Sequence, residues 1–276
     1  MKFVSFATNN GVRLGVVEGA TVIDLQAVDA NAPGDLGEAL RRGNGDLKPL
    51  AGLKFALPVA RPGKIICLGL NYLDHVKEGP QKDNIPKFQS IFFRMPTSLT
   101  PHLAPLMRPM KSIQFDYEGE LVVIIGKRAK HLTMENATDC IAGYACGNEG
   151  SIREYQRHTT QWGMGKNFDH TGSVGPWMVT ADELPKGGKG LKIETRLNGK
   201  VMQSSNTDLF MFPVAESLVY LTEGITLEPG DILFTGTPSG VGHARKPDPI
   251  WMKAGDTCEV EVEGVGVLRN PIEDEK

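Results

Sequence analysis

The chain has 276 residues, and 30 lysines and arginines against 33 aspartates and glutamates give a formal net charge of −3. This near balance excludes a protein that binds nucleic acid through bulk electrostatics, because such proteins carry a clear basic excess. Hydrophobic residues make up 40% of the chain, which supports a packed core, and the 32 glycines and 18 prolines favour tight turns and a strand-rich α+β fold.

The first residues do not resemble a secretory signal. Residues 1–7 run directly into polar Thr8, Asn9 and Asn10, without an apolar stretch or a cleavage site. No segment reaches the ~18 apolar residues that a membrane helix needs, and the four cysteines form no CxxC pair. We therefore expect a cytoplasmic protein that binds neither a membrane nor nucleic acid.

The first sixty residues are expected to form a small β-rich domain. Residues 13–17 and 21–24 are typical of two short strands joined in a hairpin, and residues 36–42 are the candidate for a short helix. Proline and glycine gather in residues 57–63, which is typical of a domain boundary. The expected division is therefore an N-terminal domain over 1–60 and a larger domain over 61–276.

The larger domain is expected to consist of strands and a few short helices. Continuous apolar runs of strand length predict strands, and apolar residues at helical spacing predict helices. The Asn-Gly pair at 198–199 is a strong hairpin signal. The expected strands are 64–70, 113–125, 192–197, 200–204 and 232–235, and the expected helices are 71–78 and the segment from Val214 to Gly224.

Two glutamates of the strand expected over 113–125 are candidates for metal ligands. Side chains two positions apart project from one face of a strand, so Glu118 and Glu120 lie together, with Asp116 one step further along. Carboxylates about 7 Å apart along a strand repel each other unless a positive charge lies between them. Hard divalent cations prefer such oxygen ligands, so this pattern favours a metal site.

The alternative is that these glutamates form the solvated face of an ordinary strand. Glu259, Glu261 and Glu263 show the same alternation near the C-terminus, and we assign them to a solvated edge. The first pair differs because the apolar run 121–125 follows it directly. A buried strand is an unusual place for a solvated acidic face, so the metal interpretation is favoured for the first pair.

A histidine and further acids extend the candidate site. His75 and Glu78 lie three positions apart on the expected helix, where they can touch. A carboxylate that orients one ring nitrogen leaves the other able to accept a proton, although surface pairs of this kind are common. Glu149 lies in the turn-rich segment 143–153, and taken alone it is better explained as a surface acid.

Two glycine-containing segments complete the set. Residues 235–242 follow a strand and could present backbone N–H groups to an anion, but they lack the Gly-Lys-Ser/Thr ending of a P-loop, so we exclude nucleotide binding. Lys166 lies among glycines, where its charge could meet a carboxylate or a developing enolate. An exposed lysine is the alternative there.

In this order the motifs resemble the fumarylacetoacetate hydrolase family, from about residue 64 to the C-terminus. The resemblance implies a mixed β-roll or β-sandwich core, a divalent metal (Mg²⁺ or Mn²⁺, with Ca²⁺ as a crystal substitute) and a homodimer. The matching pieces are G-L-N-Y-L-D-H-V-K-E (69–78), F-D-Y-E-G-E-L-V-V-I-I-G (115–126), G-Y-A-C-G-N-E-G-S-I-R (143–153), G-K-N-F-D (165–169) and L-E-P-G-D-I-L-F-T-G-T-P-S-G-V-G (227–242).

The resemblance also assigns roles to residues. Glu149 stands where the family usually has aspartate; glutamate keeps the charge but reaches one methylene further, so the metal position or the contact can differ. His75 matches the general base and Glu78 the acid that orients it. The implied metal ligands are Glu118, Glu120 and Glu149, the implied catalytic residues are His75, Glu78 and Lys166, and the implied substrate-binding residues are Gln161, Thr237, Gly236 and Arg153.

The expected reaction is metal-dependent hydrolysis of a C–C bond in a 2,4-dioxo acid, such as an acylpyruvate from aromatic or sugar acid catabolism. His75, oriented by Glu78, activates water, and Lys166 helps to neutralise the pyruvate enolate that leaves. The alternatives are decarboxylation or tautomerisation of oxaloacetate, isomerisation of another 2-oxo acid, and a catalytically silent binding protein. Candidates for contacts with the rest of the substrate are Phe88, Phe92, Phe93, Trp162 and His170. Core packing is the favoured role for two of the three phenylalanines, and packing explains Trp162 and His170 equally well.

Overall fold

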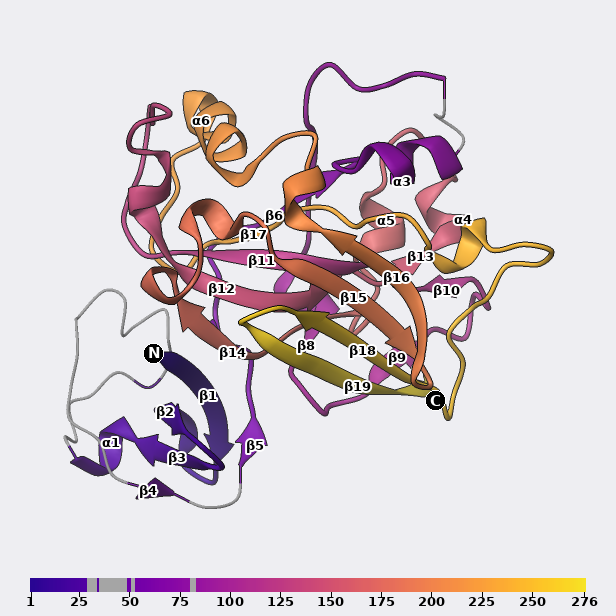
Figure 1. The fold of residues 1–276 in the computed structure, drawn as a ribbon. Helices are drawn as coiled ribbons and strands as arrows, with labels where there is room; N and C mark the ends of the chain where they lie inside the picture. Colours follow the sequence, from indigo (N-terminus) through magenta and orange to yellow (C-terminus); the bar gives the residue numbers. More distant parts are fainter. Residues whose placement is uncertain (29–33, 35–48, 51–52, 80–82) are drawn as a thin grey trace.

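Strands dominate the computed structural model, which describes residues 1–28, 34, 49–50, 53–79 and 83–276 (Figure 1). Parallel and antiparallel pairings occur in the same sheets, so the expected strand-rich α+β fold is confirmed. The helix expected over 36–42 lies outside the described residues.

The largest sheet in the described part of the chain has twelve strands. Its main order is β4-β3-β2-β1-β14-β12-β11-β17-β6-β7, with β5 paired to β1 and β8 paired to β14. The strands are β1 (Lys2–Thr8), β2 (Gly11–Glu18), β3 (Thr21–Asp24), β4 (Pro49–Leu50), β5 (Lys54–Phe55), β6 (Ile65–Gly69), β7 (Ser90–Phe93), β8 (Leu99–Thr100), β11 (Gly119–Ile125), β12 (Ile141–Asn148), β14 (Gly172–Thr180) and β17 (Ile232–Phe234).

A five-stranded sheet lies against this one, and Figure 1 shows its orange and yellow strands crossing β11, β12 and β14. Its order is β16-β15-β18-β19-β9, and a separate pair is formed by β10 and β13. The strands are β9 (Leu106–Arg108), β10 (Phe115–Asp116), β13 (Ser151–Ile152), β15 (Lys192–Leu197), β16 (Lys200–Asn206), β18 (Thr257–Val262) and β19 (Gly266–Asp274).

Strand β11 is buried on both faces, which explains the apolar run over its last five residues, 121–125. Leu121, Val123 and Ile125 belong to the core between the two sheets, together with residues of β15 and β18. Val122 and Ile124 belong to a second cluster, with residues of β6, β14 and β17. Because alternate side chains of a strand point to opposite faces, β11 is covered on both sides and forms a rigid base for the residues at its start.

The helices are short, and none in the described part of the chain is long and apolar enough to cross a membrane. The α-helices are α1 (Leu25–Val28), α3 (Leu73–Glu78), α4 (Arg153–Gln156), α5 (Gly163–Lys166) and α6 (Val214–Gly224). The 3-10 helices are η1 (Pro96–Ser98), η2 (Ala137–Cys140), η3 (Ala181–Glu183), η4 (Lys186–Gly188), η5 (Thr207–Leu209) and η6 (Gly242–Ala244).

Two features differ from the strands expected from the sequence. The run over 113–125 is broken into β10 and β11, because side-chain amides take the backbone donors at the break: the N–H of Glu118 bonds to Asn148 at 2.9 Å and that of Gly119 to Gln203 at 3.0 Å. Strand β1 was not predicted. It pairs with β14, with Lys2 opposite Val179, so the N-terminal strands continue the large sheet. The domain division at residue 60 stays a prediction.

The acidic strand near the C-terminus is not an edge. Strand β18 pairs with β15 on one side and β19 on the other. Its outward glutamates are partly exposed and share one arginine: Arg196 contacts Glu261 at 2.7 Å and Glu259 at 3.2 Å. The expected edge is therefore wrong, and these acids are offset by a cation on the neighbouring strand.

Candidate active site

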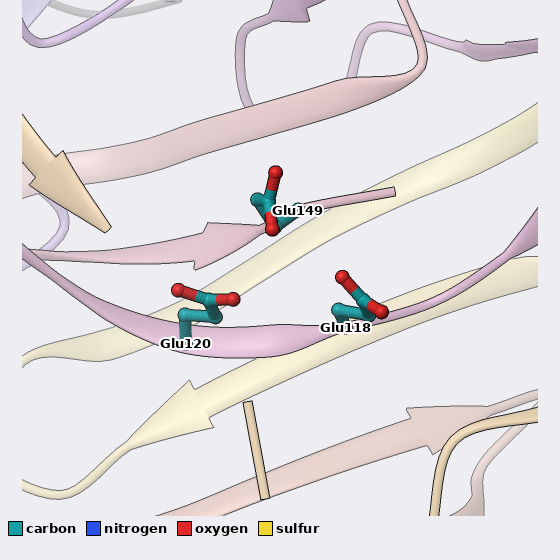
Figure 2. Close-up of side chains that lie close together, drawn as sticks. All are labelled: Glu118, Glu120 and Glu149. Atoms are coloured by element: carbon teal, nitrogen blue, oxygen red, sulfur yellow. The ribbon is translucent and has the colours of Figure 1, made fainter. Parts of the chain in front are cut away.

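Three buried glutamates meet at the start of β11 and the end of β12. Glu118 precedes β11, Glu120 is its second residue, and Glu149 directly follows β12. One carboxylate oxygen of each lies within 4.8 Å of those of the other two, and Figure 2 shows Glu118, just before β11, and Glu120, within it, projecting toward Glu149. The backbone holds this arrangement, since the N–H of Glu149 donates to the Glu118 carbonyl at 2.8 Å.

Burial and mutual repulsion govern the charges of this cluster. Burial, followed by the negative charges of Glu149 and Glu118, raises the pKa of Glu120 well above its ordinary value. Burial also raises the pKa of Glu149. Burial acts in the same direction on Glu118, but the positive charges of Arg153 and Lys166 outweigh it and lower the pKa of that carboxyl. The cluster therefore favours an additional positive charge, most strongly at Glu120.

Two buried cations pair with Glu149. Lys166, at the end of α5, places its Nζ 2.6 Å from one Glu149 oxygen and also contacts Glu118. Arg94 lies 3.2 Å from the other Glu149 oxygen and donates to Ser98, Gly150 and Thr171. Both oxygens of the longer glutamate are therefore fixed by cations, and the side chain is held at the cluster rather than directed to the surface.

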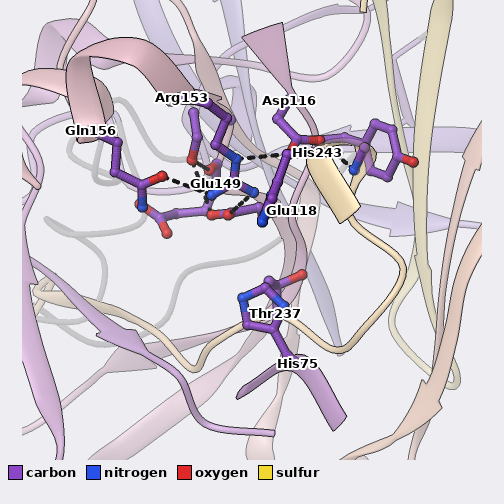
Figure 3. A network of polar contacts seen from close by, with 12 residues as sticks. His75, Asp116, Glu118, Glu149, Arg153, Gln156, Thr237 and His243 are labelled. Carbon is purple, nitrogen blue, oxygen red and sulfur yellow. Dashed lines mark hydrogen bonds and ion pairs between the residues drawn. The ribbon is translucent and has the colours of Figure 1, made fainter. Parts of the chain in front are cut away.

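Arg153 connects the cluster to a second acid. Its guanidinium contacts Glu118 and lies 2.7 Å from Asp116, and its Nη1 donates to Gln156 at 2.8 Å. Asp116 also accepts hydrogen bonds from the backbone N–H groups of Gly242 and His243. Figure 3 shows this network running from Gln156 through Arg153 to Asp116 and His243. Asp116 thus anchors Arg153 and the 3-10 helix η6 and does not join the glutamate cluster.

The donor set of the cluster fits a hard divalent cation. All three side chains offer carboxylate oxygens, which Mg²⁺ and Mn²⁺ prefer. Glu120 has the clearest need for one, because the only hydrogen bond of its carboxylate in the described part of the chain is with the Gly236 N–H, at 2.6 Å. Residues Glu118, Glu120 and Glu149 would hold the ion, and the site lies at the base of a cavity rather than on the surface.

The histidine pair lies on α3, which faces the same cavity. The Nδ1 of His75 is 2.8 Å from Glu78 Oε1. Both Glu78 oxygens accept a hydrogen bond from the backbone N–H of Gly240, at 3.1 and 2.9 Å. The loop after β17 therefore fixes the acid, the acid fixes the imidazole, and Nε2 is the ring nitrogen left to exchange a proton.

The loop after β17 also contains two of the predicted substrate-binding residues, Gly236 and Thr237. Thr237 lines the cavity, donates to the Gly119 carbonyl at 2.9 Å and accepts from Gln203 at 2.8 Å. Gly236 has a φ of +94°, and a Cβ there would lie 2.7 Å from that of Asn71. Glycine is therefore required for the turn that aims the Gly236 N–H at Glu120.

A small open cavity of about 110 Å³ brings these residues together. Glu78 and Gly236 are not among the lining residues, but each holds a lining residue in place by a hydrogen bond: Glu78 to His75, and Gly236 to Glu120. Gln161 is exposed and does not line the cavity, so its substrate contact stays a prediction without structural support. Of the sequence-predicted residues, those on the wall are His75, Glu118, Glu120, Glu149, Arg153, Lys166 and Thr237.

Several wall residues were not singled out from the sequence. Gln156 lines the cavity where Gln161 was expected; it lies three positions after Arg153 on α4, a spacing that could have identified it. Arg157 and His243 also line the wall. Arg94 supports it from 55 positions away in the chain from Glu149, and no local pattern signals such a pairing.

Two of the five aromatic or histidine candidates reach the cavity. Phe92 and Trp162 line it and meet edge to face, with ring centroids 5.5 Å apart. Phe88 and Phe93 are exposed, so the core packing favoured for two of the three phenylalanines is wrong. His170 is exposed and lies outside the wall. The two aromatic rings therefore lie beside the charged residues of the wall, and Lys166 Nζ is 5.1 Å from the centroid of the Phe92 ring.

Residues 64–273 match the family "Fumarylacetoacetate (FAA) hydrolase C-terminal". "Oxaloacetate tautomerase Fahd2a, mitochondrial" from Rattus norvegicus is 36% identical over 95% of this chain and 86% of its own length. The fumarylacetoacetate hydrolase (EaFAH) of Exiguobacterium antarcticum has a TM-score of 0.88 and 33% identity over 100% of both chains. The 2-hydroxyhepta-2,4-diene-1,7-dioate isomerase of Mycobacterium marinum has a TM-score of 0.81 and 29% identity, over 100% of this chain and 99% of its own.

Proposed function

Since the chain belongs to the fumarylacetoacetate hydrolase family, we propose that it is a metal-dependent enzyme that interconverts the enol and keto forms of a 2-oxo dicarboxylate such as oxaloacetate. The observation that carries this proposal is the placement of an oriented histidine on the same cavity as a buried cluster of three carboxylates. One relative is named an oxaloacetate tautomerase and a solved neighbour is named a dioate isomerase. Both names describe proton shifts in dicarboxylic acids.

The chain's own residues divide the work of this reaction. When bound, the divalent cation would supply a Lewis acid that stabilises negative charge on the C2 oxygen of the substrate. Lys166 adds a fixed positive charge beside Glu118 and Glu149, where it stabilises the same oxygen. Lys166 and the three glutamates are buried, which strengthens both interactions.

His75 moves the proton at C3. In the direction from enol to keto, the C2 hydroxyl gives its proton to solvent water, its O–H electron pair becomes the carbonyl π bond, and the C2=C3 pair takes a proton from protonated His75 Nε2, which solvent then protonates again. In the reverse direction, Nε2 removes a proton from C3. Glu78 holds Nδ1 during both steps, which fixes the direction of the ring.

The second candidate is the hydrolysis of an acylpyruvate, the reaction expected from the sequence. The His75–Glu78 pair favours it as well, because a histidine oriented in this way can activate water. Cleavage of the C3–C4 bond would release the same kind of enolate that tautomerisation uses. The two reactions therefore share the residues described above and differ in whether water attacks C4.

We expect purified protein supplied with Mg²⁺ or Mn²⁺ to accelerate the loss of the ultraviolet absorbance of enol-oxaloacetate. A chelator should abolish the acceleration and added metal should restore it, because the three glutamates repel one another without the cation. Acetylpyruvate, followed in parallel, reports hydrolysis. Turnover that persists in chelator would remove the metal from the mechanism, and the absence of turnover with either substrate would favour a catalytically silent protein.

The same proposal extends to the metal, the assembly and the location of the protein. We expect Mg²⁺ or Mn²⁺ as the resident metal, a homodimer as the assembly, and a 2-oxo acid as the partner. A cytoplasmic location stays a prediction, and the relative from Rattus norvegicus is named as mitochondrial. A role in aromatic or sugar acid catabolism depends on the substrate and is tested by the same assays.

A further inference from the structure

Arg157 differs from the other lysine and arginine side chains of the cavity wall. Arg153 pairs with Asp116 and Glu118, and Lys166 pairs with Glu118 and Glu149. Arg157 also lines the cavity, yet within the described ranges its guanidinium forms no ion pair or hydrogen bond. The cavity therefore carries one cation whose charge is not already matched by an acid of the wall.

The position of Arg157 is set by its neighbours. It follows the last residue of α4, and its backbone N–H donates to Glu154 and Tyr155 at the helix end. Partial burial and the nearby charge of Arg153 both disfavour its positive charge, while Asp116 favours it. The residue itself is exposed, so its side chain lies at the entrance rather than at the base of the cavity. An anion that enters would relieve the repulsion between the two arginines.

A second polar group of the cavity wall, the imidazole of His243, also has an atom without a partner among the described residues. His243 lines the cavity, and its Nδ1 lies 3.3 Å from Asp116, the acid that also influences Arg157. Its Nε2 is buried without a hydrogen-bond partner in the part of the chain that the structure describes. Buried polar atoms are rarely left in this state, which indicates that the wall is completed by a polar ligand.

We propose that Arg157 binds the second carboxylate of the substrate and so selects 2-oxo dicarboxylates over 2-oxo monocarboxylates. The identity of the substrate rests on the proposed function. The first carboxylate and the C2 oxygen face the glutamate cluster and Lys166, and the remote carboxylate meets the guanidinium at the entrance. The planar fork of arginine suits this role because it offers two parallel N–H donors to one carboxylate.

Oxaloacetate and pyruvate are the matched ligands for the test, since they differ by one carboxylate. We expect Arg157→Gln to weaken the binding of fresh oxaloacetate roughly 10- to 100-fold, as the loss of a hydrogen bond to a charged group implies, and to change pyruvate binding less than about twofold. Arg157→Lys should restore part of the oxaloacetate affinity. Titration calorimetry with Mg²⁺ present measures all of these constants, with Arg128→Gln on the outer surface as the control.

The binding experiment does not require turnover, so it separates this inference from the proposed function. Loss of the oxaloacetate preference in Arg157→Gln supports the inference even where the wild type fails to tautomerise oxaloacetate. A wild type that binds oxaloacetate no better than pyruvate would overturn it. So would an Arg157→Gln variant that keeps the wild-type preference while its melting temperature shows a normal fold.

Discussion

His75→Ala is expected to lower kcat for the interconversion of enol and keto oxaloacetate by about 10²- to 10⁴-fold, the usual contribution of a general acid or base. The imidazole is the group whose free nitrogen can exchange a proton at C3, and no other histidine of the described wall is oriented by a carboxylate on its own helix. Metal content should stay at the wild-type level, because His75 does not belong to the glutamate cluster. Steady-state kinetics and metal analysis of the same sample measure both quantities.

Two further variants make this result specific. Glu78→Gln keeps the shape of the side chain but removes its charge, so we expect a smaller loss of kcat than in His75→Ala. His158→Ala removes an exposed histidine that does not line the cavity, and its kinetics should match the wild type. Wild-type turnover in His75→Ala would exclude this histidine as the proton carrier.

Glu120→Gln is expected to abolish metal binding and, with it, activity. Changes in residues that merely support a metal ligand cost 10- to 100-fold in affinity, so the loss of a ligand charge should raise the Kd for Mn²⁺ by more than about 100-fold. The amide oxygen can still accept the Gly236 N–H. Without metal, the variant should melt at or above the wild-type temperature, because burial and the neighbouring glutamates disfavour the Glu120 charge and raise its pKa.

The two proteins should therefore respond differently to metal. A ligand that binds the folded state raises the melting temperature, so Mn²⁺ should stabilise the wild type and leave Glu120→Gln unchanged. Glu273→Gln changes an exposed glutamate near the C-terminus and should respond as the wild type does. Equal stabilisation of the wild type and Glu120→Gln by Mn²⁺ would contradict the assignment of Glu120 as a ligand.

The parts of the site that could be predicted from the sequence depend on local patterns. The spacing of Glu118 and Glu120, and the apolar run after them, reflect a strand that is buried on both faces. His75 and Glu78 lie within one turn of a short helix, so their contact follows from helical geometry. That Glu149 lies close to these two glutamates was expected only from the resemblance to a family. Local sequence patterns do not indicate it, because residues on neighbouring β-strands can be distant in the sequence.

The parts that could not be predicted depend on contacts between distant segments. Arg94 pairs with Glu149 because β7 ends beside the glutamate cluster, and nothing near either residue in the sequence indicates it. Side-chain amides of Asn148 and Gln203 interrupt the expected strand before β11. Gln161 lies five positions beyond Gln156, after α4 has ended, and is exposed, whereas Gln156 on α4 lines the cavity.

The central claim is that this cavity forms and protonates the enolates of 2-oxo acids. Exchange of the C3 protons of pyruvate with deuterium from D₂O tests it directly, because exchange requires the enolate whichever reaction the enzyme completes. Proton NMR of pyruvate with the Mn²⁺-free, Mg²⁺-loaded protein should show exchange well above the buffer rate, lost in chelator and in His75→Ala. Exchange at the buffer rate with Mg²⁺-loaded wild-type protein would contradict the account.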